Sequence, residues 1–125
     1  KNYQLNGEWD LANNAIELAK SKLEELLNKQ SQNSFFLTTL SNIYLSEARQ
    51  RIYEQNQTDD KPIVNTAKLN ACQKAIVILK PIITANSSYG VLLPYVQAHD
   101  CLGKLNKVPE FVSKLEEMQI KKYQF

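Results

Sequence analysis

The stretch "ACQKAIVILKPIITANSSYGVLLPYVQAHDCLGK", residues 71–104, holds two apolar segments, a polar break between them and one cysteine in each segment. Apolar residues recur there at steps of three and four, which is the period of an α-helix and not the alternation of a strand. Pro81 lies near the end of the first segment, and Gly103 ends the second. The stretch therefore predicts two helices joined by the connector "ANSSYG", residues 85–90.

The same period extends over most of the chain, and no segment alternates with period two for long enough to predict a strand. The sequence therefore predicts an all-α fold. Asn33 or Ser34 is suited to cap the start of the second helix. We expect Pro81 to disturb the last turn of the third helix. We expect Pro94 to fall in the first turn of the fourth helix and Gly103 to end that helix. The predicted helices are residues 8–29, the apolar stripe of residues 36–53 with its cap at 33 or 34, and residues 63–84, 92–103 and 108–120.

The composition is that of a single domain or short repeat array, residues 1–125. Hydrophobic residues make up 43% of the chain, enough to fill a core, and the net charge of +2 is far below that of a dedicated nucleic-acid-binding protein. Lysines and glutamates are mixed over residues 17–29 and 110–122, which we interpret as solvated helix faces. No segment approaches the roughly 20 apolar residues of a membrane span. Because the chain begins at Lys1, we expect a segment of a longer protein.

Short connectors between helices predict antiparallel hairpins, either in a closed bundle or in a stacked helical repeat. A repeat of this kind places large residues on the first helix of each hairpin and small residues where the helices cross. Three segments of the chain resemble tetratricopeptide repeats in this respect. The matching positions are Tyr3, Gly7, Ala12, Ile16 and Ala19, then Leu37, Leu40, Ser41, Tyr44, Cys72 and Ala75, then Leu92, Tyr95, Val96, His99, Gly103, Val108, Val112 and Leu115.

The resemblance covers residues 63–120 well and residues 1–55 loosely. The segments "ACQKAIVILKPI" and "LLPYVQAHDCLGKLNKVPEFVSKLEEMQI" are similar to the tetratricopeptide-type tails of bacterial serine/threonine kinases and membrane-anchored winged-helix regulators. Gln119 stands where those tails commonly have glycine, so we expect the last turn to end differently. The resemblance implies hairpins stacked as a right-handed superhelix of about five helices, and a protein-interaction module without catalytic residues.

Cys72 and Cys101 are isolated in the sequence, without the paired ligands that a zinc site requires. Free cysteine commonly packs as a small hydrophobic residue, so we interpret both as buried thiols. The alternative is a disulfide in an oxidising compartment. A helical hairpin that turns at residues 86–88 would allow this bond, because it places the two cysteines opposite each other. If the fourth helix begins at Pro94, or if the tetratricopeptide register holds, we expect the two cysteines to lie out of line.

His99 is the single histidine and the one candidate general base. It lies two residues from Cys101, and residues two apart on a helix point about 200° away from each other. No acidic residue follows at a spacing typical of a catalytic triad, so we interpret His99 as a packing residue. The sequence predicts no catalytic residue, no metal site and no cofactor.

Stacked hairpins leave a concave surface on which rigid helices present side chains to a partner. We therefore expect a non-enzymatic module that binds a protein or peptide, as the sensory or scaffolding part of a larger bacterial signalling protein. The alternative functions are a homodimerisation bundle and a small hydrolase. The sequence does not decide whether the protein lies on the cytoplasmic or the periplasmic side of a bacterial inner membrane. The predicted binding residues on the concave surface are Thr38, Asn42, Arg49, Gln97 and Asp100.

Overall fold

A computed structural model describes residues 7–55 and 61–122 of the chain. Within these ranges the backbone forms α-helices, one short 3-10 helix and no strand, so the all-α prediction is confirmed. Tyr3, the first of the repeat matches, lies outside the described residues. The helices are α1 (Gly7–Lys29), α2 (Ser34–Gln55), α3 (Lys61–Leu79), α4 (Tyr89–Cys101), the 3-10 helix η2 (Leu105–Lys107) and α5 (Pro109–Lys122).

Local sequence features place most helix ends as predicted, and α1, α2 and α5 begin and end within about two residues of the predicted positions. Asn33 caps α2, because its Oδ1 accepts a hydrogen bond from the backbone N–H of Phe36 at 3.0 Å. Gly103 ends α4 with a φ of 68°, a left-handed conformation that suits glycine. The N–H of Gly103 donates to the carbonyl of Asp100 at 2.9 Å and that of Lys104 to His99 at 2.8 Å, which closes the helix end.

The two helices of the 71–104 stretch differ from their predicted bounds. α3 ends at Leu79 and not at residue 84, because Pro81 disfavours the helical conformation at the residue before it. α4 begins at Tyr89 and not at residue 92, so Pro94 lies inside the helix and not in its first turn. Since proline has no N–H, the carbonyl of Gly90 lacks its helical donor there.

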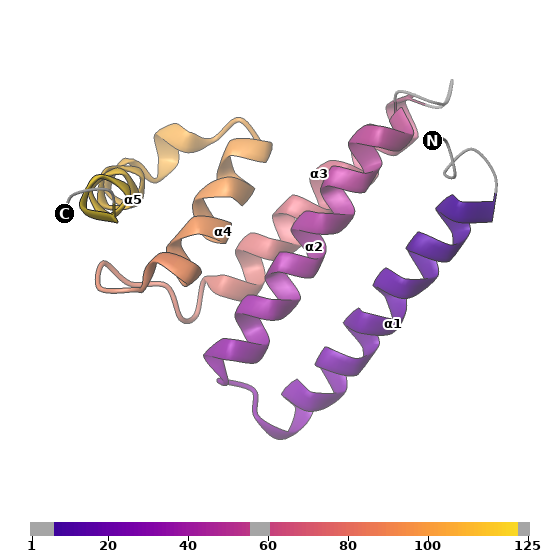
Figure 1. Ribbon diagram of the computed structural model, residues 1–125, viewed down its shortest axis with the longest axis horizontal. Helices are drawn as coiled ribbons and strands as arrows, with labels where there is room; N and C mark the ends of the chain where they lie inside the picture. Colours follow the sequence, from indigo (N-terminus) through magenta and orange to yellow (C-terminus); the bar gives the residue numbers. More distant parts are fainter. Residues whose placement is uncertain (1–6, 56–60, 123–125) are drawn as a thin grey trace.

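The helices form an open array. α2 and α3 make the most extensive contact, α1 packs on α2, α4 packs on both α3 and α2, and α5 packs on α4. Figure 1 shows α1 and α5 at opposite ends of this arrangement. Among the described residues, α1 makes no extensive contact with α4 or α5. The helices therefore do not close into a bundle, and each keeps part of its surface uncovered.

The main core lies where α2 crosses α3. Small residues on these helices, Ala48, Ala71 and Ala75, are buried and let the two backbones approach each other. Leu79 has no exposed surface at the end of α3. A second, smaller group of buried residues joins α4 to α5, and it consists of Leu92, Val96 and Leu115.

A disulfide links α3 to α4. The sulfur atoms of Cys72 and Cys101 are bonded, and their Cα atoms lie 6.3 Å apart. Our preference for buried free thiols was therefore wrong, although Cys72 is fully buried, as that interpretation expected. The early end of α3 and the early start of α4 make these helices a hairpin, and the hairpin brings the two cysteines face to face.

Candidate functional site

The three predicted binding residues on α2 lie along one side of the helix, because spacings of four and seven residues repeat the helical turn. Asn42 and Arg49 are exposed, and Arg49 donates a hydrogen bond to Ser46 Oγ at 3.3 Å. Thr38 is half-buried, and its hydroxyl oxygen is buried without a hydrogen-bond partner. The structure thus leaves two of these side chains available to a partner and covers the third.

The two predicted binding residues on α4, Gln97 and Asp100, are exposed. Within the described part of the chain, no hydrogen bond or ion pair joins them to Thr38, Asn42 or Arg49. Four of the five residues are therefore exposed on two contacting helices, Thr38 is covered, and the role of all five in binding remains a prediction.

His99 is buried in α4 and bonded within its own helix. Its Nδ1 lies 2.9 Å from the carbonyl oxygen of Tyr95, and because a carbonyl can only accept, the Nδ1–H donates this hydrogen bond. The imidazole also packs edge-on against the ring of Tyr95, at 4.7 Å between centroids, and Tyr95 in turn packs against Phe111 at 5.6 Å. Burial, followed by the charge of Glu110, raises the pKa of Tyr95. These contacts make His99 part of the α4–α5 packing.

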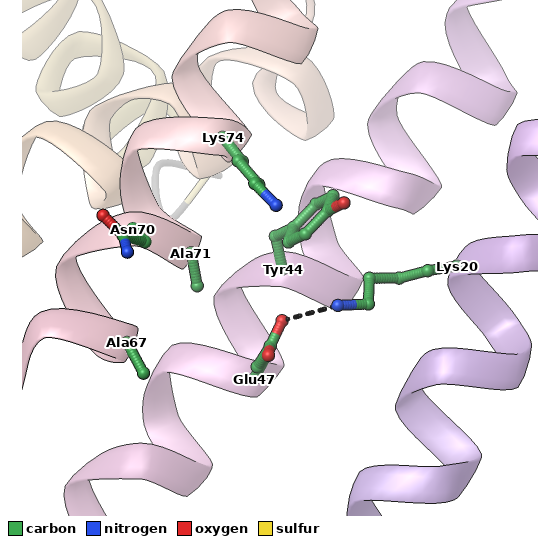
Figure 2. Close-up of a pocket in the computed structure, with 7 residues that line it drawn as sticks. All are labelled: Lys20, Tyr44, Glu47, Ala67, Asn70, Ala71 and Lys74. Atoms are coloured by element: carbon green, nitrogen blue, oxygen red, sulfur yellow. Dashed lines mark hydrogen bonds and ion pairs between the residues drawn. The ribbon is translucent and has the colours of Figure 1, made fainter. Parts of the chain in front are cut away.

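A polar pocket that no sequence pattern predicted lies between α1, α2 and α3. Its volume is about 180 Å³. Figure 2 shows Lys20 reaching from α1 toward Glu47 on α2, while Lys74 points from α3 toward the ring of Tyr44. The lining residues are Lys20, Tyr44, Glu47, Ala67, Asn70, Ala71 and Lys74.

Lys20 is the buried charge of this pocket, with 9% of its surface exposed. Its Nζ lies 2.7 Å from Glu17 Oε2 and 3.1 Å from Glu47 Oε1, and 4.8 Å from the centroid of the Tyr44 ring. Burial acts to lower the pKa of Lys20, but the hydrogen bonds and charges of Glu17 and Glu47 outweigh it and hold the pKa above its ordinary value. The ammonium is therefore a fixed positive charge that ties α1 to α2.

Tyr44 forms one wall of the pocket and is itself buried. Burial raises the pKa of its hydroxyl, and the nearby charge of Lys20 opposes that shift only in part. A second cation approaches the same ring, because Lys74 Nζ lies 5.6 Å from its centroid. Both distances are within the range of cation–π attraction. The aromatic ring thus holds two ammonium groups at the pocket.

The lining of the pocket combines small apolar side chains with an amide and charged groups. Two alanines of α3, Ala67 and Ala71, provide the space, and Asn70 supplies an amide. The single carboxylate in the lining, that of Glu47, is engaged by Lys20. Across residues 7–55 and 61–122, no three His, Cys, Asp or Glu side chains lie close enough to hold a metal ion. In the same ranges, no helix is long and apolar enough to cross a bilayer.

A sequence feature points to this pocket in retrospect. Lys20 follows Ile16 by four residues and precedes Leu23 by three, so it lies on the apolar side of α1. We had assigned the lysines of residues 17–29 to a solvated face, and for Lys20 that assignment was wrong. Its partner Glu47 lies 27 residues away in sequence, which no helical periodicity relates to Lys20.

Comparisons with protein-family models, with curated proteins and with solved structures found no match to this chain. The similarity to tetratricopeptide tails therefore rests on the residues quoted above and stays a prediction.

Proposed function

We propose that this chain is a non-enzymatic protein-interaction module that binds a partner protein or peptide. The observation that carries the proposal is the open array, in which α1 and α5 lie at opposite ends and each helix keeps a surface uncovered. Rigid helices lose little conformational freedom when a partner binds, so such surfaces are suited to recognition. The polar pocket between α1, α2 and α3 adds a defined recess to this surface.

We further propose that the hairpins stack as tetratricopeptide repeats do. In this arrangement α2–α3 and α4–α5 are successive repeats, and α1 is the second helix of a preceding one. The packing of α4 on both α2 and α3 supports the proposal, because a following repeat contacts both helices of the one before it. A place in a larger bacterial signalling protein rests on the sequence resemblance alone.

The module is tested by selecting peptides from a random display library on the immobilised chain and measuring the enriched peptides by calorimetry. We expect at least one to bind more tightly than about 1 mM, and Asn42→Ala with Gln97→Ala to weaken it. The matched control removes two exposed amides elsewhere, with Asn28→Ala and Gln73→Ala, and leaves the affinity unchanged. A selection that enriches no binding peptide would contradict the proposal.

A second candidate function is self-association through α1. Leu11 and Leu18 are 67% and 71% exposed, and Leu26 is 40% exposed. Spacings of seven and eight residues place all three along one side of the helix. Light scattering of the wild-type chain would then show the mass of a dimer. The Leu18→Lys variant would show the mass of a monomer, with an unchanged melting temperature. A monomer at every concentration would exclude this candidate.

A further inference from the structure

We propose that the pocket between α1, α2 and α3 binds the carboxylate of an acidic side chain, through Lys74 and Asn70. The inference rests on the proposed interaction module and names the chemistry of the partner: a polypeptide that presents an aspartate or glutamate to this recess.

The size of the pocket suits a single side chain. Its volume of about 180 Å³ is smaller than the roughly 300–1,000 Å³ of sites that hold a cofactor or drug-sized ligand. The recess exists because Ala67 and Ala71 on α3 face the larger side chains of Tyr44 and Glu47 on α2 (Figure 2). One carboxylate on a short aliphatic stem fits such a space.

The charges in the lining favour an anion. Of the three charged side chains there, Lys20 and Lys74 are cationic and Glu47 is anionic. Lys20 is already bound by Glu47 and by Glu17, which lies outside the pocket lining. Lys74 has no carboxylate within ion-pair distance among the described residues, and its ammonium is held 5.6 Å from the Tyr44 ring. Lys74, which is exposed on α3, is therefore the cation of the lining that has no ion pair with a carboxylate of the described residues.

Asn70 and Lys74 both line the pocket. They are four residues apart on α3, so they lie on one side of the helix a single turn apart. Figure 2 shows the Lys74 ammonium directed toward the Tyr44 ring and the Asn70 amide turned away from it, so Asn70 reaches a ligand beside Lys74 only by rotating its side chain. The amide of Asn70 and the ammonium of Lys74 both donate hydrogen bonds, and a carboxylate accepts from both. Hydrogen bonds of this charge-assisted kind are the stronger ones in proteins.

A cationic occupant fits less well. A lysine or arginine side chain would have to displace Lys20 from Glu47, and Lys20 is 91% buried in its two ion pairs. A phosphate carries a charge of −1.5 to about −2 at neutral pH, so both its attraction to Lys74 and its repulsion from Glu47 exceed those of a carboxylate, and a phosphate probe is needed to compare the two groups.

Nuclear magnetic resonance of the whole 125-residue chain tests the inference. The probe is the capped tripeptide acetyl-Ala-Glu-Ala-amide, and acetyl-Ala-Gln-Ala-amide is its neutral control. We expect the glutamate peptide to shift the amide signals of Asn70, Ala71 and Lys74 at millimolar concentration and the glutamine peptide to leave them in place. Equal shifts from both peptides, shifts confined to other parts of the chain, or no shifts would overturn the inference.

Two variants and a third probe sharpen the test. Lys74→Gln should weaken the affinity for the glutamate peptide at least about five-fold. The control Lys80→Gln makes the same change at an exposed lysine of the α3–α4 connector and should leave that affinity unchanged. Both positions are exposed, so both variants should fold, and the melting temperature of each variant is the check. Inorganic phosphate that shifts the same signals at a lower concentration than the peptide would overturn the choice of a carboxylate.

The outcomes separate this inference from the module itself. Peptides enriched in the display selection should contain an acidic residue whose replacement by its amide weakens binding. If enriched peptides bind, but their affinity depends neither on an acidic residue nor on Lys74, the interaction module is supported and the carboxylate site is excluded. If no peptide is enriched, but the glutamate tripeptide still shifts the amide signals of Asn70 and Lys74, the pocket binds carboxylates and the interaction module is contradicted.

Discussion

Removing the disulfide between Cys72 and Cys101 should lower the stability of this chain more than any surface change. The two cysteines are separated by 29 positions in sequence, so the bond closes a loop of that length. In the chain-entropy model, a loop of this size stabilises the folded state by about 3.6 kcal/mol at 25 °C, because it restricts the unfolded chain. Unfolding a 125-residue domain has an entropy of about 0.26 kcal/mol/K, so the melting temperature should fall by about 14 °C.

The assay is thermal unfolding followed by circular dichroism, on the oxidised chain, on the chain with a reducing agent, and on the Cys72→Ala, Cys101→Ala double variant. Reduction keeps every side-chain atom, so it isolates the effect of the bond. The double variant adds the loss of a buried sulfur at position 72, which costs about 1 kcal/mol more. A reducing agent should leave the double variant unchanged.

Two results would refute this reasoning. One is a melting temperature of the wild-type chain that changes by less than about 3 °C on reduction. The other is two titratable thiols in the denatured, unreduced protein, which would mean that the bond between α3 and α4 does not form.

The remaining predictions concern the core, the buried lysine and pH. In a urea titration, Leu79→Ala should lower the free energy of unfolding by about 2–5 kcal/mol, because Leu79 has no exposed surface. The control Val77→Ala, at a position that is 59% exposed, should lower it by less than about 1 kcal/mol. Lys20→Met should lower the free energy of unfolding by about 2–3 kcal/mol, because it leaves the half-buried carboxylate of Glu47 without this cation. The control Lys22→Met, at an exposed position of α1, should change the free energy of unfolding little. Equal effects of the two variants would contradict the ion-pair geometry. The pKa of Lys20 and that of Tyr44 are both raised in the folded state, so each favours folding below its unfolded pKa and this contribution is lost as the pH rises through the folded value. The melting temperature should therefore stay level from about pH 7 to 9 and fall above about pH 10, and a level curve to about pH 11 would exclude this coupling.

Much of the fold could be predicted because it depends on neighbours along the chain. The three- and four-residue spacing of apolar side chains defines a helix within one segment, and a cap such as Asn33 or Gly103 acts on the backbone a few residues away. Such features are present in the sequence whatever the helices later pack against. The all-α class, most helix bounds and the absence of period-two segments followed from this local physics.

The pocket and the disulfide depend on how helices cross, which no local pattern determines. Lys20 meets Glu47, and Cys72 meets Cys101, across separations of 27 and 29 residues. Whether Cys101 meets Cys72 depends on how α4 packs on α3, and the burial of Lys20 depends on how α1 lies on α2. By itself the sequence determined which segments become helices and, for α1, α2 and α5, where they begin and end to within about two residues. Only the tertiary structure decided which side chains meet, because long-range contacts are set by packing geometry, and periodicity within a segment says nothing of the angle or register between two segments.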